Sequence, residues 1–148
     1  MKIYCATMED LEEVSTLFNL YRVFYQQPSN LQDARVYIKN RLENEDSVIF
    51  IVKDEQKCVG FTQLYPTFSS ISMKRAWILN DLYVDVKFRR QGIAELLLHK
   101  AKEFAISTGA NSITLTTAVD NYAAQQLYQK NEYKRDSHFY HYDLALTN

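Results

Sequence analysis

The sequence predicts a mixed α/β fold (α+β mixed), in which a central twisted mixed β-sheet carries helices on both faces. The predicted elements follow the order βααβββαβαβ(β), which requires a sheet covered on two sides. The chain has 148 residues, of which 47% are apolar, and this is enough to build one hydrophobic core. No linker, repeat or low-complexity segment interrupts it, so a single domain spanning residues 1–148 is expected.

The first strand and two helices are predicted from the N-terminal third. Residues 2–6 alternate in polarity and are rich in β-forming side chains. A helix then carries apolar side chains at three- and four-residue spacing until just before Pro28, and a second helix follows up to residues 40–44. The side chains expected to cap these helices are Thr7 for the first, and Ser29 or Asn30 for the second.

The middle of the chain is predicted to form three strands. Residues 47–52 and 58–65 flank a short polar segment, which is typical of a hairpin. Gly60 lies inside the second of these strands and indicates a bulge or a close backbone neighbour. A polar connection is expected over residues 66–72, before a third strand over residues 75–85.

The C-terminal third is predicted to hold two helices and the remaining strands. Residues 95–106 have a helical stripe that ends at Gly109, in the position of a C-terminal cap. Residues 112–119 are rich in β-branched side chains and predict a strand. Asp120 or Asn121 is placed to cap a short helix over residues 122–129, and residues 133–146 predict one or two final strands.

Charge and composition exclude several classes of function. The net charge is −1 and no run of five like charges occurs, which argues against a nucleic-acid partner. No signal-peptide pattern and no bilayer-length apolar stretch is present, so a cytoplasmic protein without a membrane partner is expected. Cys5 and Cys58 are expected to be buried free thiols. The three histidines fit no metal spacing, and no metal is expected.

An anion site is predicted where the third strand meets the helix that starts near residue 95. The segment Arg89-Arg90-Gln91-Gly92-Ile93-Ala94 places backbone N–H groups at a helix N-terminus, which attracts phosphate. It lacks the three glycines of a dinucleotide fingerprint and the Gly-Lys-Ser/Thr of a Walker loop. A capped helix with solvated arginines explains this hexapeptide equally well when it is taken alone.

A second element favours the phosphate interpretation. The segment Leu82-Tyr83-Val84, the hexapeptide 89–94 and the later Asn121-x-x-Ala124-x-x-Leu127-Tyr128 resemble the GCN5-related N-acetyltransferase (GNAT) family in order and spacing. The resemblance covers most of the chain. Residues 60–66 and 79–84 are further similar to diamine and polyamine acetyltransferases and to the Hpa2-like group.

The resemblance implies that acetyl-CoA is the co-substrate. It implies that the end of the third strand splays from the strand holding Leu115 and Thr116, and binds the pantetheine arm through its backbone. It also implies that Tyr128 donates a proton or hydrogen bond to the leaving thiolate, for which a phenol of pKa ~10 is suited. A tyrosine of the core is the alternative for Tyr128. The residues implied to bind the cofactor are Leu82, Tyr83, Val84, Arg89, Arg90, Gln91, Gly92, Ile93, Ala94, Asn121 and Tyr128.

The group that removes the proton from the amine is less clearly indicated. Polyamine-type relatives carry a glutamate at the position of Asn80, and an asparagine cannot act as a base, although it can position a water molecule. Strand alternation places the neighbouring Asp81 on the opposite face, so a structural or steering role is favoured for it over that of a base. A second departure is Asn131-Glu132-Tyr133, where relatives carry Gly-Phe, and it places the local turn in doubt.

The expected acceptor is a primary amine of a small molecule, such as a polyamine or amino acid. Tyr21 and Tyr25 are candidate substrate residues because ring faces attract ammonium groups, while Phe24 is expected in the core. A non-catalytic acyl-CoA-binding domain and a protein or histone N-acetyltransferase remain alternatives. A second copy in a homodimer is the other partner that the sequence leaves open.

Overall fold

The computed structural model describes residues 1–147, which form two compact units. The first unit spans Met1–Thr116 and contains the sheet, and the second begins at Thr117. The prediction of a single domain stays a prediction.

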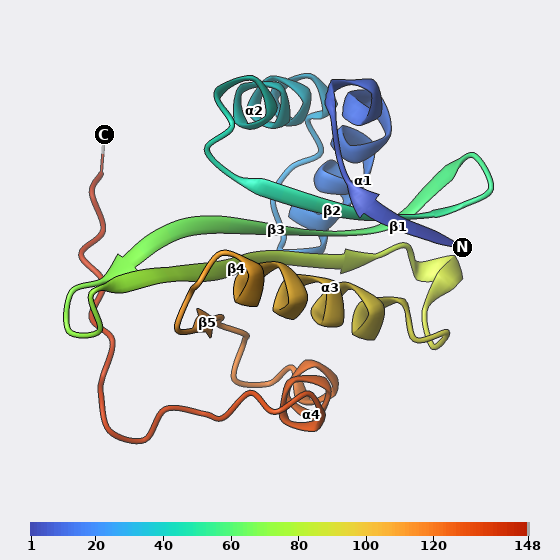
Figure 1. Ribbon diagram of the computed structural model, residues 1–148. Helices are drawn as coiled ribbons and strands as arrows, with labels where there is room; N and C mark the ends of the chain where they lie inside the picture. Colours follow the sequence, from blue (N-terminus) through green and yellow to red (C-terminus); the bar gives the residue numbers. More distant parts are fainter. Residues whose placement is uncertain (148) are drawn as a thin grey trace. The chain divides into compact units, whose positions relative to one another are not determined.

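The first unit is built on a five-stranded sheet in the order β1-β2-β3-β4-β5 (Figure 1). Neighbouring strands from β1 to β4 are antiparallel, whereas β4 and β5 are parallel, so the predicted mixed sheet is confirmed. The strands are β1 (Lys2–Cys5), β2 (Val48–Asp54), β3 (Lys57–Ser69), β4 (Lys74–Val84) and β5 (Ile113–Thr114).

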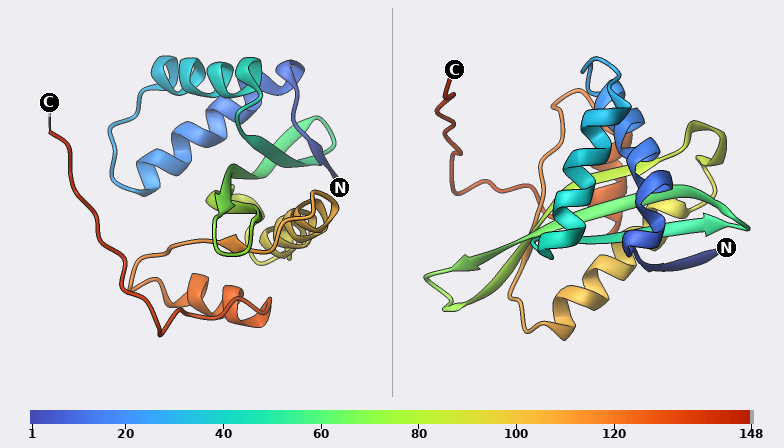
Figure 2. Two further views of the ribbon diagram at one scale, coloured as in Figure 1. Left: turned by 60° about the vertical axis from the view of Figure 1, so that its left-hand side comes forward. Right: turned by 90° about the horizontal axis from the view of Figure 1, so that it is seen from above.

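Helices cover both faces of this sheet, as predicted (Figure 2). A short 3₁₀ turn, η1 (Met8–Asp10), leads into α1 (Leu11–Phe24), and α1 packs beside α2 (Leu31–Asn44) on one face. The opposite face carries α3 (Ile93–Ser107), which follows a second 3₁₀ turn, η2 (Val86–Phe88). Apolar side chains of β2 are buried toward both layers, because successive residues of a strand face opposite sides.

The predicted helix caps are present. The Thr7 side chain accepts from the backbone of Glu9, and the Asp10 carboxylate accepts from the backbone N–H of Thr7, which forms a capping box. Asn30 caps α2 by accepting from the Asp33 N–H at 3.0 Å. Gly109 follows α3 with φ +74°, a left-handed conformation that suits glycine.

Gly60 is required by the close approach of α3 to the sheet. A Cβ atom at this position would lie 3.0 Å from Cγ2 of Ile93 and 3.4 Å from Cδ1 of Leu97. The pairing of β2 with β3 also shifts by one residue beside Gly60. Both expectations for this glycine, a bulge and a close neighbour, are therefore confirmed.

Several boundaries differ from the prediction. The connection predicted over residues 66–72 is largely strand, since β3 continues to Ser69. Pro66 is tolerated there because β2 pairs with β3 only as far as Leu64, which leaves one side of β3 without a ladder partner. The strand predicted over residues 112–119 is reduced to β5. Cys58 is buried as expected, but Cys5 is exposed on the edge strand β1.

The second unit contains α4 (Tyr122–Lys130), which Asn121 caps by accepting from the Ala124 N–H at 3.1 Å. The strands predicted over residues 133–146 are not formed in the described chain, which is extended and without ladder pairing after the helix. Glu132 adopts φ +72°, so the turn where relatives carry glycine is formed with a glutamate instead. Across residues 1–147, no helix combines the length and apolarity needed to span a bilayer.

Candidate active site

A cleft of about 240 Å³ lies in the first unit, where the C-terminal end of α1 and one side chain of α2 meet β3 and β4. It brings together the candidate substrate residues Tyr21 and Tyr25 with the candidate catalytic residues Asn80 and Asp81. These pairs are more than fifty positions apart in the sequence. The complete lining is Phe18, Tyr21, Arg22, Tyr25, Gln27, Tyr37, Tyr65, Asn80 and Asp81.

A bulge in β4 explains why both Asn80 and Asp81 reach the cleft. Gln63 of β3 pairs with Asp81 and the next residue, Leu64, pairs with Leu79, so Asn80 is an extra residue without a partner. The extra residue interrupts the alternation of side chains. Asn80 Nδ2 donates to Asp81 Oδ1 at 2.8 Å. The prediction that these side chains point to opposite faces is therefore wrong.

Asp81 is a buried carboxylate, with only 2% of its surface exposed. Burial is the main cause that raises its pKa above the ordinary value, because it disfavours the charged form. Hydrogen bonds from the side chains of Gln63, Asn80 and Tyr21 oppose this shift. The carboxylate is thus fixed in direction and is more basic than an exposed aspartate, which are properties of a proton acceptor.

A second polar side chain orients Asp81 from behind. Gln63 is fully buried, and its Nε2 donates to Asp81 Oδ2 while its Oε1 accepts from Ser47 Oγ at 2.8 Å. The Ser47 hydroxyl fixes which end of the Gln63 amide faces the aspartate. Neither Gln63 nor Ser47 was predicted as a site residue from the sequence. The signal for Gln63 is its place inside the apolar strand 58–65, because a buried polar side chain there needs a hydrogen-bond partner.

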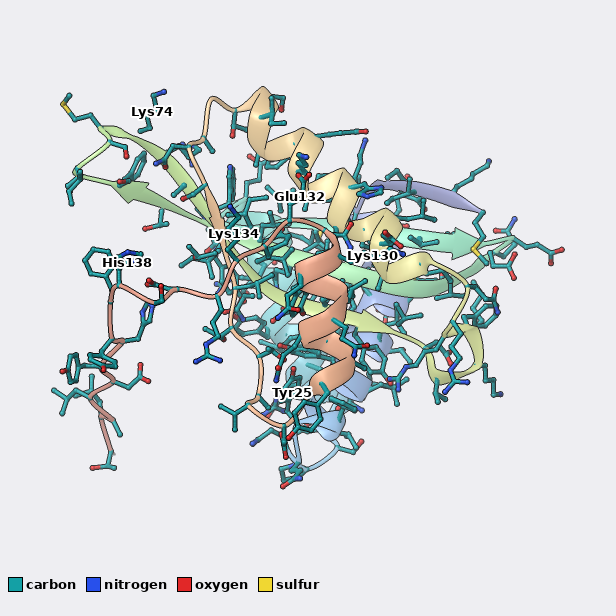
Figure 3. The ribbon with its side chains drawn as sticks, turned by 90° about the horizontal axis from the view of Figure 1, so that it is seen from below. Tyr25, Lys74, Lys130, Glu132, Lys134 and His138 are labelled. Carbon is teal, nitrogen blue, oxygen red and sulfur yellow. The ribbon has the colours of Figure 1, made fainter. Side chains whose placement is uncertain are left out.

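Tyrosine side chains form the wall of the cleft. The Tyr21 hydroxyl donates to the Asn80 carbonyl at 3.1 Å, and its ring also packs against the apolar core beneath α1. The hydroxyls of Tyr37 and Tyr65 are 2.6 Å apart, and burial raises the pKa of Tyr65, which stays protonated at neutral pH. Tyr25, labelled in Figure 3, is partly exposed at the end of α1. Phe24, expected in the core, is 52% exposed.

The N-terminus of α3 is suited to hold an anion. No side chain caps the helix at Gly92, so its first N–H groups have no partner within the helix. Gly92 has φ +78°, and a Cβ atom there would meet nothing within 4 Å, which leaves open space in front of the backbone. A phosphate-bearing co-substrate fits these donors and this space.

The two arginines before this helix differ from a simple pair of phosphate ligands. Arg89 donates from Nε to the Val84 carbonyl at 2.9 Å, and its guanidinium lies over the rings of Tyr83 and Phe24, at 5.3 and 5.7 Å from their centroids. It thus fixes the turn after β4 as well as adding positive charge. Arg90 is exposed and has φ +64°, so it helps shape the loop.

The C-terminal half of β4 has a free edge within the first unit. β5 pairs with β4 only at Trp77 and Ile78, so Leu82, Tyr83 and Val84 have no strand on that side among residues 1–116. Leu115 and Thr116 leave the sheet after β5. A backbone edge of this kind binds an extended chain through hydrogen bonds, as expected for a pantetheine arm.

The remaining candidates, Asn121 and Tyr128, lie on the second unit. Asn121 uses its side-chain oxygen to cap α4, which leaves the amide NH₂ group for other partners. The Tyr128 ring is partly buried and packs against Tyr133, with ring centroids 5.9 Å apart. Lys130, Glu132 and Lys134 surround the C-terminal end of α4 (Figure 3).

The histidines take no part in the cleft. His141 lies 3.7 Å from the Asp136 carboxylate in the second unit, and the Asp136 carboxylate also accepts from the backbone of His138. Within residues 1–147, no group of three or more histidine, cysteine or acidic side chains is arranged to hold a metal ion.

Comparison with known proteins decides the family. The profile of the Acetyltransferase (GNAT) family matches residues 14–133. The chain belongs to this family. A GNAT relative, the uncharacterized N-acetyltransferase YhfO of Bacillus subtilis (strain 168), is 48% identical over 146 residues, covering 99% of this chain and 98% of its own. A probable acetyltransferase of Haemophilus influenzae is 32% identical and covers 83% of this chain and 85% of its own.

A solved acetyltransferase structure agrees with the fold along its length. The crystal structure of a probable acetyltransferase has a TM-score of 0.95 and 40% identity, and covers 100% of this chain and 99% of its own. The chain is therefore a GNAT N-acetyltransferase, and acetyl-CoA is the acetyl donor that the family uses. The narrower likeness to diamine, polyamine and Hpa2-like enzymes stays a prediction.

Proposed function

We propose that this GNAT protein transfers the acetyl group of acetyl-CoA to the primary amine of a small molecule by direct attack. The observation that carries the proposal is the cleft lined by tyrosines and by the buried Asp81. Aromatic faces and a buried carboxylate together favour an ammonium group. The size of the cleft, about 240 Å³, corresponds to roughly eight water molecules and favours a compact acceptor.

Asp81 is assigned to bind the protonated amine and to accept its proton. A free primary amine of pKa ~10.4 is mostly protonated at neutral pH, so a proton must leave before attack. The Asp81 carboxylate has four acceptor positions, and the hydrogen bonds from Gln63, Asn80 and Tyr21 leave one of them for an amine. Asn80 holds Oδ1 and is placed to order a water molecule that carries the proton outward.

The co-substrate is assigned to the edge of β4 and the start of α3. The open backbone at Gly92 and the first N–H groups of α3 would hold the pyrophosphate, with Arg89 and Arg90 adding charge-assisted contacts. Leu82 to Val84 would hold the pantetheine arm. Bound there, acetyl-CoA supplies an activated thioester. Tyr128 is assigned to donate a proton to the sulfur as the thiolate leaves.

A screen for thiol release tests the proposed reaction. The protein is mixed with acetyl-CoA and, in turn, with diamines, polyamines, amino acids, aminoglycosides and lysine peptides. Release of coenzyme A with one of the small amines supports the proposal. Acetyl-CoA should also raise the melting temperature, because it binds the folded state. A protein that binds acetyl-CoA without turnover on any amine would be an acyl-CoA sensor, and turnover on peptides alone would make it a protein acetyltransferase.

The role of Asp81 is tested by the pH dependence of kcat/KM. Burial raises the pKa of Asp81, so the activity should fall as the pH drops through a value above the ordinary ~3.9 of aspartate. Asp81→Asn should lose about 10²- to 10⁴-fold in rate and also lose this acidic limb. Asp54→Asn, on the hairpin turn, is the control that should keep both.

The competing mechanism uses only a water chain at Asn80. In that case the rate would climb with pH toward the pKa of the amine, and Asp81→Asn would keep the same profile with a changed KM. Asn80→Ala should lower the rate modestly under either mechanism. The shape of the profile in Asp81→Asn therefore decides between the two.

A further inference from the structure

The cleft contains one cationic side chain that the proposed reaction does not use. Arg22 lies in the last turn of α1 and lines the same cavity as Asp81. Its side chain is partly buried, and no carboxylate among the described residues lies within ion-pair distance of it. Arg41, near the rim, differs because it is paired with Asp46 at 2.9 Å.

An arginine in this position is suited to bind an anionic ligand. Partial burial of a guanidinium removes water from it, and a carboxylate that it binds through two parallel hydrogen bonds replaces that water well. No carboxylate of the described residues forms an ion pair with Arg22, and the partners of Asp81 are the side chains of Gln63, Asn80 and Tyr21. The cleft thus presents a carboxylate and a guanidinium that are separated from each other.

We propose that the acceptor is a compact aminocarboxylate, whose ammonium group faces Asp81 and whose carboxylate binds Arg22. This inference rests on the proposed function, since it names the substrate class of the same site. The cleft of about 240 Å³ has room for a compact acceptor with both charged groups. A diamine would bring a second cation beside Arg22, which is unfavourable.

Matched pairs of acceptors show how much the carboxylate of the acceptor contributes to kcat/KM. Glycine, β-alanine and 4-aminobutyrate are each compared with the amide of the same skeleton, and 4-aminobutyrate also with 1,4-diaminobutane. At least one aminocarboxylate should show a kcat/KM about 10- to 100-fold above that of its amide, through KM. Arg22→Ala should abolish this preference, and Arg22→Glu should reverse it in favour of 1,4-diaminobutane.

Arg35→Ala is the control, because Arg35 is an exposed arginine of α2 that pairs with Glu12 away from the cleft. It should keep the preference for the carboxylate. Circular dichroism and the melting temperature confirm that each variant is folded. Equilibrium binding of the best aminocarboxylate to the protein, by calorimetry, gives a readout that does not need turnover and should weaken in Arg22→Ala.

The outcomes distinguish failure of the aminocarboxylate assignment from failure of the proposed acetylation of a small amine. If 1,4-diaminobutane or the amides react as well as the aminocarboxylates, or Arg22→Ala keeps the preference, the aminocarboxylate assignment is wrong while small-amine acetylation stands. If no small amine reacts although acetyl-CoA binds, the proposed function itself is wrong, and the aminocarboxylate assignment fails with it.

Discussion

The two units of the molecule differ in how they are stabilised. Every described residue that is less than 9% exposed lies in the first unit, the last of them being Ala105 of α3. The second unit consists of one nine-residue helix and an extended segment, without a buried side chain of that kind. The residues of the cleft and of the anion site therefore lie on a packed core. The candidate proton donor, Tyr128, lies on α4, which is shorter than a helix that is stable on its own.

The difference shows that the two groups assigned to proton transfer belong to different units, Asp81 to the first and Tyr128 to the second. The cleft and the anion site belong wholly to the first unit. Substitutions of the binding residues Arg22 and Gly92 should change affinity, and substitutions of the proton-transfer residues Asp81 and Tyr128 should change the rate. The experiments below test this division, beginning with the largest expected effect.

Removal of the Tyr128 hydroxyl should give the largest effect. Tyr128→Phe keeps the ring that packs against Tyr133 and removes only the proton donor. We expect kcat to fall by about 10²- to 10⁴-fold, with acetyl-CoA affinity little changed. Tyr122→Phe, on the exposed first turn of the same helix, is the matched control and should retain full activity. An unchanged kcat in Tyr128→Phe would show that Tyr128 is not the proton donor and has only a structural role.

A glutamate at the start of α3 should have the next largest effect. Gly92→Glu adds a side chain and a negative charge where the pyrophosphate is assigned, so the rise in melting temperature with acetyl-CoA should shrink markedly. Gly109→Glu is the matched control, because Gly109 has a similar φ (+74° against +78°) and equally open surroundings at the other end of the helix. Both variants carry the same backbone strain, but only Gly92→Glu should lose the rise in melting temperature with acetyl-CoA. Equal responses would contradict the anion site.

The two cysteines give the smallest and simplest test. Burial raises the pKa of the Cys58 thiol to about 12, and this residue is part of the packed core of the first unit. Cys5 is exposed at the sheet edge. A thiol reagent at pH 8 should modify one cysteine quickly in the native protein and both in denaturant. Cys5→Ser should abolish the fast phase, whereas rapid loss of two thiols from native protein would show that the core opens.

Local signals in the sequence predicted most of the fold. Helix caps at Thr7 and Asn30, and the glycine after α3, are decided by neighbouring residues, and the structure confirms all three. The C-terminal strands were predicted from β-rich composition alone. Strand formation depends on a partner edge as well as on composition, and residues 133–147 have no ladder partner in the described chain.

The site was predicted less completely, for a similar reason. Residues that act through a motif, such as Gly92, are placed as expected at the start of α3. Arg22, Gln63 and Tyr65 enter the site through contacts between distant segments, which spacing along the chain does not report. The orientation of Asp81 was predicted wrongly because regular alternation was assumed across a bulge.

The bulge at Asn80 has a consequence for how this enzyme can change over evolution. One additional residue in β4 sets the phase of every side chain that follows it, from Asp81 to Val84. A substitution at position 80 alters one group, whereas loss of that single codon would remove the bulge and the Nδ2 donor to Asp81 while leaving Asp81 opposite Gln63. New acceptor preferences are therefore accessible by point changes around the tyrosine wall, whereas a one-residue deletion here would remove a group that holds the carboxylate and orders water beside it.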